Sequence, residues 1–314
     1  MRIYFCSDIH GSRRCWKKFL NSWKFYGADH IIVGGDITGK FVVPIMAEAR
    51  GTWSATFLGV RRRVASADGL ARLERSIADA GQYAFRTTPD EYAWYSEDQA
   101  RIDGLFRRLV VERATEWVEE AEEKLDGAPV RAFVSGANDD FIEVDEVLAR
   151  STRLEDPNGR VIELDGGYEL LGMGWGNPTP WNCPRDIPEE DLAQRIDEVA
   201  AHVRDRARAI FSLHVPPLGS GLDVAPKLDD YLTPRMGLGG VEMIPVGSTA
   251  TRDAILRYRP LLGLHGHIHE SKGVTALGGV PIANPGSEYG EGILDGLIVD
   301  IDRTGVRGIE LVAG

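Results

Sequence analysis

The chain has 314 residues, of which 43% are apolar and 27% are charged. These values are typical of a globular protein, and the length allows one large α/β domain or two small ones, each with a full core. With 36 basic and 48 acidic residues the net charge is −12. That charge opposes non-specific binding to polyanions, so long nucleic acid is disfavoured as a partner.

Nothing in the sequence indicates export or membrane insertion. No apolar stretch approaches the ~20 residues of a membrane-spanning helix. Residues Met1–Asp8 lack the basic segment and cleavage site of a secretory leader. Three cysteines, Cys6, Cys15 and Cys183, are too few for a disulfide scaffold or a thiolate metal site. We therefore expect a cytoplasmic protein without a membrane partner.

The first segment predicts a strand, a helix and a second strand. The continuous apolar run Ile3–Ser7 is typical of a strand buried on both faces. Ser12 is a suitable N-cap for a helix that ends near Gly27, and Ile31–Val33 predicts the next strand. This order favours parallel βαβ construction, in which ligands bind at the carboxyl ends of the strands.

Residues from about 40 to 128 predict a helical elaboration. Thr88, Pro89 and Glu91 form a helix-start signal, and apolar residues recur at helical spacing from Ile102 to Leu125. A further helix is predicted at 72–80. We interpret this segment as an addition near one edge of the sheet, either a lid or extra core, within a single domain that covers residues 1–314.

The remaining sequence predicts strands separated by two helices. The helices are expected at about 189–208 and directly after Ser248, where Pro260 closes the second one. We expect the strands to form mostly hairpins. They are predicted at 130–134, 161–164, 168–173, 210–213, 261–264, 280–283, 297–301 and 306–311.

Seven polar residues directly follow apolar runs and are candidate metal ligands: Asp8, His10, Asp36, Asn138, His214, His267 and His269. Asp, Asn and His suit borderline divalent metals. One such Asp or His alone is more often a turn, cap or structural residue. Seven at strand ends, and so at one edge of a sheet, favour a metal site. His30 and His202 lack this placement and are interpreted as structural or surface residues.

The order Asp-x-His, Gly-Asp, Gly-x-Asn-x-Asp, His and Gly-His-x-His resembles the calcineurin-like metallophosphoesterase family. The stretch Gly278–Tyr289, with Asn284-Pro-Gly-Ser287, resembles a segment of its small bacterial and archaeal phosphodiesterase members. The resemblance implies an α/β fold, a four-layer αββα sandwich of two mixed β-sheets flanked by helices. It also implies two divalent metal ions (Mn, Fe or Zn) at the strand ends.

By the family pattern, one ion takes Asp8, His10, Asp36 and His269, and the other takes Asp36, Asn138, His214 and His267. The implied function is hydrolysis of a phosphodiester or phosphomonoester of a small molecule by attack of a metal-bridging hydroxide. A phosphodiesterase is favoured over a phosphatase. Two alternatives remain open: a nuclease on short nucleic acid, and a metal-bound scaffold protein with little turnover.

One position departs from the family pattern. Many members have a His after the Asn of the third motif, and that His is thought to protonate the leaving group. Here Asp139 stands at that position. Next to two cations it is expected to stay ionised, so it cannot donate the proton. Good leaving groups are then required unless His265 or water supplies the proton.

The helix start after Gly11 is a candidate phosphate site, because N–H groups at a helix N-terminus attract anions. Ser12 and Arg13 are the residues expected to bind substrate there.

Overall fold

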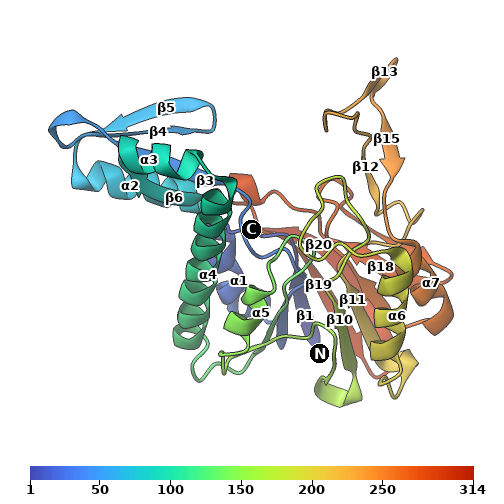
Figure 1. Ribbon diagram of the computed structural model, residues 1–314. Coiled ribbons are helices and arrows are strands. Elements are labelled where there is room, and N and C mark those ends of the chain that lie inside the picture. The colour runs from blue at the N-terminus through green and yellow to red at the C-terminus, as the bar shows by residue number, and fades with distance from the viewer.

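The computed structural model describes residues 1–314, and its main body consists of two facing six-stranded sheets (Figure 1). In sheet order the first contains β20 (Gly305–Ala313), β19 (Asp295–Asp302), β1 (Arg2–Cys6), β2 (His30–Val33), β7 (Arg131–Val134) and β8 (Leu154–Glu155). The second contains β17 (Gly273–Leu277), β18 (Val280–Asn284), β16 (Leu262–Leu264), β11 (Ala209–Leu213), β10 (Glu169–Met173) and β9 (Val161–Glu163).

Helices cover the outer face of each sheet. The first sheet carries α1 (Arg13–Tyr26), α4 (Gln99–Lys124) and α5 (Glu143–Leu148), and the second carries α6 (Glu189–Ala200) and α7 (Thr249–Tyr258). Strand residues alternate between the two faces. In β1, Ile3 and Phe5 pack between the sheets, whereas Tyr4 and Cys6 pack against the helices. The predicted four-layer αββα sandwich is confirmed.

Strand pairing differs from the expected hairpins. In the second sheet β10, β11, β16 and β18 are all parallel, joined by connections that include α6 and α7. The hairpins are β9–β10, β17–β18 and β19–β20. The expectation of mostly hairpins was therefore wrong for the centre of this sheet. Because those strands are parallel, their carboxyl ends meet at one edge.

The predicted helix starts at Ser12 and Thr88 are confirmed. The Ser12 side chain accepts the N–H of Cys15, and α1 is followed by Gly27 in the left-handed region (φ 65°). Thr88 caps α3 (Pro89–Ser96) by accepting the N–H of Glu91. The helix α6 is shorter than predicted and stops at Ala200.

The segment at about 40–128 is not only helical. It contains a four-stranded sheet of β5 (Val60–Val64), β4 (Trp53–Phe57), β3 (Val42–Ala47) and β6 (Tyr83–Thr87), together with α2 (Ala67–Asp79) and α3. The helical prediction was wrong for these strands, because β3 pairs in parallel with β6 across a separation of about 40 residues that no local pattern reveals. The sheet and α2 share a small core of their own and project from the body (Figure 1).

A β-ribbon projects from the body on the other side of the same end (Figure 1). Its base is β12 (Val224–Pro226) paired with β15 (Met243–Pro245), and its tip contains β13 (Met236–Gly237) and β14 (Gly240–Val241). Short 3-10 helices are η1 (Ala49–Gly51), η2 (Asp165–Gly167), η3 (Arg206–Arg208) and η4 (Tyr289–Glu291). None of the helices combines the length and the apolar character needed to cross a membrane.

Candidate metal centre

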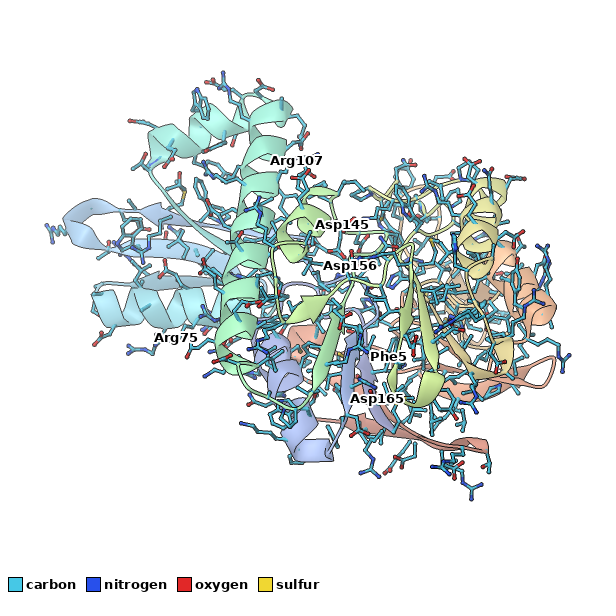
Figure 2. The ribbon with its side chains drawn as sticks, turned by 90° about the horizontal axis from the view of Figure 1, so that it is seen from below. Phe5, Arg75, Arg107, Asp145, Asp156 and Asp165 are labelled. Atoms are coloured by element: carbon cyan, nitrogen blue, oxygen red, sulfur yellow. The ribbon has the colours of Figure 1, made fainter.

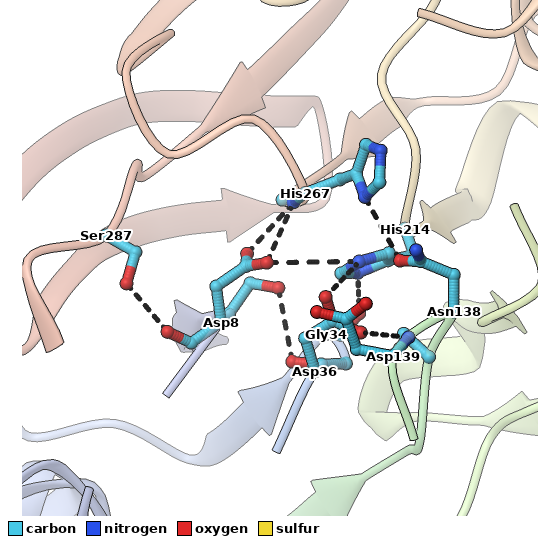
Figure 3. Close-up of polar contacts among 12 residues, drawn as sticks. Asp8, Gly34, Asp36, Asn138, Asp139, His214, His267 and Ser287 are labelled. Atoms are coloured by element: carbon cyan, nitrogen blue, oxygen red, sulfur yellow. Dashed lines mark hydrogen bonds and ion pairs between the residues drawn. The ribbon is translucent and has the colours of Figure 1, made fainter. Parts of the chain in front are cut away.

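The structure brings the seven predicted ligand residues together. Three groups have ligand atoms that all lie within 4.8 Å of one another. Two consist of predicted ligands, Asp8, His10 and His269 in one and Asp36, His214 and His267 in the other, and the third joins His10 and Asp36 to Asp139. Asn138 joins the second group, because its Oδ1 lies 3.0 Å from His267 Nδ1 (Figure 3). The set follows the carboxyl ends of β1, β2, β7, β11 and β16.

The backbone that carries these ligands is strained. Asp8, His10, Asp36 and His267 have φ angles of 56°, 37°, 51° and 65°. Residues other than glycine rarely adopt positive φ, and such conformations persist where the surroundings enforce them. The tight loops after the strands therefore hold these four side chains at a cost in backbone energy, as is common at functional sites.

The imidazoles of the site face carboxylates and one another. His10 Nε2 lies 3.0 Å from His269 Nε2, and His269 Nε2 lies 3.4 Å from Asp8 Oδ1. In the second group, His214 Nε2 lies 3.3 Å from Asp36 Oδ2, and its Nδ1 lies 3.0 Å from the carbonyl oxygen of Gly34.

Burial and charge shift the ionisation of these groups. Burial and the nearby Asp139 charge raise the pKa of Asp36 to about 7. Burial lowers the pKa of His267 to about 3 and also keeps the pKa of His10 well below its ordinary value. Burial raises the pKa of Asp8, but a hydrogen bond from His269 and the charge of His214 outweigh it and hold that pKa below its usual range. His10 and His267 are therefore neutral, the form in which an imidazole binds a cation. Burial opposes protonation of His214 as well, but Asp36 outweighs it and raises the pKa of His214 to about 9, so a metal ion would have to displace a proton from this ring.

These residues fit divalent metal ions. Buried His214 Nε2 lies 3.3 Å from Asp36 Oδ2 and 3.9 Å from Asp8 Oδ1, but neither contact has hydrogen-bond geometry, although buried polar atoms normally have a partner. His10 and His269 turn ring nitrogens toward each other at 3.0 Å, an arrangement that a cation beside both would stabilise. The donor set of carboxylate oxygens, an amide oxygen and imidazole nitrogens suits Mn, Fe or Zn.

Asp139 also faces this site, and it is paired with a residue that the sequence analysis missed. Lys40 forms an ion pair with Asp139 Oδ2, and the thiol of Cys183 donates to Asp139 Oδ1 at 2.7 Å. Burial raises the pKa of Asp139, but Lys40 and His10 outweigh burial and lower it. The carboxylate is thus held by Lys40, which lies four residues after Asp36 in a segment that the sequence assigned to the start of the elaboration.

A buried carboxylate joins two of the ligand loops. Asp140 is 0% exposed and accepts the N–H groups of Ile37, Thr38 and Ala137 as well as the Thr38 hydroxyl. The N–H of Asp139 in turn donates to Asp36 Oδ1 at 3.0 Å. These bonds fix the Asp36 loop against the Asn138 loop.

A buried arginine supports the same region from behind. Arg185 is 0% exposed, makes a bidentate pair with Asp145 at 2.7 and 3.0 Å, and donates to the carbonyl oxygens of Asp140 and Phe141. Two bonds in parallel fix its position. Figure 2 shows Asp145 on α5, on the side of the first sheet that the helices cover.

The Asn284–Ser287 segment ties the remaining loops. Asn284 is fully buried and donates to the carbonyl oxygens of Gly266 and Ile268, and Ser287 donates to the carbonyl oxygen of Asp8 at 2.6 Å (Figure 3). This segment therefore positions ligands rather than acting as one. Tyr289, which the sequence analysis did not single out, packs its ring against His10 at 4.8 Å between centroids.

Ser12 and Arg13 are not placed to bind substrate. The Ser12 hydroxyl is 0% exposed, donates to the carbonyl oxygen of Asp79 at 2.7 Å and accepts the N–H of Cys15. The elaboration covers the start of α1, so Ser12 joins it to the ligand loop instead. Arg13 is half-buried and does not line the cavity described below.

The other histidines also lie outside the site. His265 is 0% exposed, and its Nδ1 lies 2.7 Å from the carbonyl oxygen of Leu213, so it cannot reach a leaving group. His30 is buried at the start of β2, and His202 is exposed after α6.

A cavity of about 670 Å³ opens beside the ligands. At one end it is lined by Asp36, Lys40, Asn138, Asp139, His267 and His269. The rest of its wall comes from the 177–183 loop and the β-ribbon. The ligand cluster is therefore accessible to a small molecule.

No known protein-family model matches the chain. One curated relative, an uncharacterized protein, MJ1162, of Methanocaldococcus jannaschii, is 27% identical over 129 residues, which is 40% of this chain. The match spans about half (51%) of that relative's length.

Solved structures share the fold over nearly the whole chain. One crystal structure has a TM-score of 0.58 at 14% identity and covers 99% of this chain and 98% of its own. The protein TT1561 of Thermus thermophilus has a TM-score of 0.54 at 14% identity and covers 99% and 97%. An archaeal phosphodiesterase aligns at a TM-score of only 0.38 and 11% identity over the full length of both chains, which is too low to bear on the fold. In fold and in the order of its ligand motifs, the chain resembles the calcineurin-like metallophosphoesterases.

Proposed function

We propose that this protein is a metal-dependent phosphoesterase that hydrolyses a phosphodiester of a small molecule. The observation that carries the proposal is the pair of Asp/His groups, which lie next to each other at the strand ends and open into one cavity. A cytoplasmic location is part of the proposal, and the three free thiols are consistent with it.

Asp8, His10, Asp36 and His269 would hold one divalent ion, and Asp36, Asn138, His214 and His267 a second one. When bound, the ions supply Lewis acidity that polarises a phosphoryl oxygen and acidifies a water molecule. The amide of Asn138 is oriented for this task, because its Nδ2 donates to Asp186 at 3.3 Å and its Oδ1 is left facing the site.

Lys40 provides the positive charge that the chain itself contributes to the cavity. Its ammonium group is held by Asp139 at the ligand end of the cavity, close to Asp36. There it would bind a phosphoryl oxygen of the substrate and stabilise the charge that develops during displacement. The chain as a whole is acidic, with a net charge of −12, so the attraction for an anion comes from the cations at this end of the cavity, Lys40 and the metal ions that the ligands would hold.

Asp139 cannot serve as the proton donor, because its carboxylate accepts from both Lys40 and Cys183. Without an acid on the leaving group, the enzyme depends on leaving groups that depart as stable anions. Esters of acidic alcohols, such as aryl esters, are therefore favoured over esters that must expel an alkoxide.

The test is hydrolysis of bis-p-nitrophenyl phosphate and p-nitrophenyl phosphate with added Mn²⁺, with the Asp36→Asn variant as the control for metal dependence. We expect hydrolysis of both, faster for the diester. A protein that holds two metals and hydrolyses neither compound would contradict the proposal and leave the scaffold alternative.

A further inference from the structure

The cavity has a second half that plays no part in metal binding. It is formed by the loop at 177–183 and by the inner side of the β-ribbon. Its lining includes the apolar side chains Pro178, Pro180, Trp181, Leu228, Leu232 and Ile244. Trp181 is 61% exposed and Leu232 is 44% exposed. A cluster of exposed apolar side chains beside a cluster of ligands is typical of a binding surface.

The size of the cavity requires a substrate larger than phosphate. At about 670 Å³ it falls within the range of roughly 300–1,000 Å³ that holds drug-sized organic ligands. A phosphoryl group next to Asp36, Lys40 and His267 fills only one end. The ester group attached to it then extends toward Trp181 and the ribbon, since these form the rest of the wall.

The charged groups on the ribbon side already have partners within the ribbon. Lys227 Nζ donates to Glu242 Oε1 at 3.0 Å. The carboxylate of Asp229 accepts the N–H groups of Tyr231 and Thr233 at 2.9 and 3.0 Å. Two of the charged groups on this side are thus already engaged, and an apolar group placed against Trp181, Leu228 and Leu232 would gain contact area.

One buried polar atom of a lining residue, Asn177 Oδ1, has no hydrogen-bond partner. Asn177 lines the same cavity as Lys40 and Trp181.

We infer that the substrate is a phosphodiester with one hydrophobic ester group, alkyl or aryl, which lies between Trp181 and the β-ribbon and stays on the phosphate when the better leaving group departs. This inference rests on the proposed function, because it assigns the phosphoryl group to the ligand end of the cavity.

The test is binding of methyl-, butyl- and octylphosphonic acid to the Mn²⁺-loaded protein by calorimetry. These compounds share one phosphonate head and are not hydrolysed, so the readout is independent of turnover. Each methylene that becomes buried raises the affinity roughly three- to fourfold. We expect the affinity to rise from methyl to octyl along this series.

The variant Trp181→Ala removes the largest apolar side chain of the wall without touching a ligand. It should flatten the dependence on chain length and leave methylphosphonic acid binding unchanged. The matched control is Trp94→Ala, because Trp94 is 49% exposed on α3 and does not line the cavity. That variant should behave like the unmodified protein.

The outcomes separate the two proposals. Equal affinity for methyl- and octylphosphonic acid, together with hydrolysis of bis-p-nitrophenyl phosphate, overturns the apolar substrate class and leaves the phosphoesterase function intact. Affinity that rises with chain length and falls in Trp181→Ala, without hydrolysis of any diester, supports the apolar site and overturns the enzymatic function. A chain-length effect that Trp181→Ala does not change overturns the assigned position of the apolar group.

Discussion

The carboxylate of Asp140 accepts both the backbone N–H and the hydroxyl of Thr38, at 2.8 and 2.5 Å. The two residues belong to different ligand loops, one after β2 and one after β7. Their contact therefore sets the distance between Asp36 and Asn138. The metal centre depends on this buried polar connection as much as on the ligands themselves.

Replacing Asp140 with Asn should destabilise the fold and weaken metal binding together. The amide presents N–H groups to backbone donors that need an acceptor, so the free energy of unfolding should fall by about 2–4 kcal/mol. Denaturant unfolding of the metal-free protein measures this change. Asp230→Asn is the control. Asp230 is exposed on the ribbon, so this substitution should leave the free energy of unfolding unchanged. An Asp140→Asn variant with unchanged stability would show that the contact is dispensable.

Replacing Asp36 with Asn should weaken binding of both metal ions and abolish hydrolysis. Asp36 is the carboxylate assigned to both ions, and an amide is a poorer ligand with no charge. Calorimetric titration with Mn²⁺ measures the affinity and the number of ions. Asp165→Asn serves as the control, since Asp165 lies 3.5 Å from His30 at the start of β2, whereas Asp36 follows the end of that strand. Two tightly bound ions in Asp36→Asn would refute the ligand assignment.

Lys40→Gln should lower kcat/KM for phosphodiesters by about 10²-fold, because one pre-positioned donor to the developing charge is lost. Metal content should stay the same, since Lys40 carries a positive charge and is not a ligand. The control is Lys227→Gln, a lysine that lines the same cavity but is paired with Glu242. Equal effects of the two substitutions would show that Lys40 acts only through the general charge of the cavity.

Asp139→His should improve hydrolysis of esters with poor leaving groups. A histidine at this position can donate a proton to the leaving group. We expect kcat/KM for such esters to rise only about tenfold, less than the 10²–10⁴ of established general acids, because the surrounding residues do not orient the new imidazole. The measurement is the ratio of kcat/KM for an alkyl ester to that for a p-nitrophenyl ester. A ratio that does not change would mean that position 139 does not approach the leaving group.

Glu122 should make stability depend on pH. Its carboxylate accepts from the Ser151 hydroxyl, from the N–H and hydroxyl of Thr152, and from the N–H of Arg153. Burial opposes ionisation, but these bonds outweigh it and lower the pKa of Glu122 to about 2.

Because the folded pKa is depressed, the stabilisation is present above the unfolded pKa of about 4.3 and is lost as the pH falls toward 2. After allowance for partial solvent screening, Glu122→Gln should lower the free energy of unfolding by about 1–2 kcal/mol at pH 7 and by much less near pH 2. Urea unfolding at several pH values measures the difference. Glu123→Gln, at an exposed neighbouring position, should show no such dependence; a pH-independent cost for Glu122→Gln would contradict the role of its charge.

Much of this protein can be deduced from local sequence patterns. Apolar runs such as Ile3–Ser7 mark buried strands, and capping residues such as Ser12 and Thr88 mark helix starts, because both signals depend on neighbouring residues only. The ligand residues could be predicted for the same reason, since parallel strands bring their carboxyl ends to one edge whatever the loops do.

Contacts between segments that are distant in the chain could be seen only in the tertiary structure. Lys40 acquires its role only when Asp139 lies beside it, and Arg185 is buried only because Asp145 and the carbonyl oxygens of the 140–141 loop meet it there. From the sequence alone, Ser12 could act either as a helix cap or as a substrate ligand. The packing of the 40–128 segment against it leaves only the role of helix cap. Pairings of this kind depend on long-range geometry. The sequence by itself therefore determined the candidate metal ligands, and the fold determined the Lys40 cation and the apolar wall beside them.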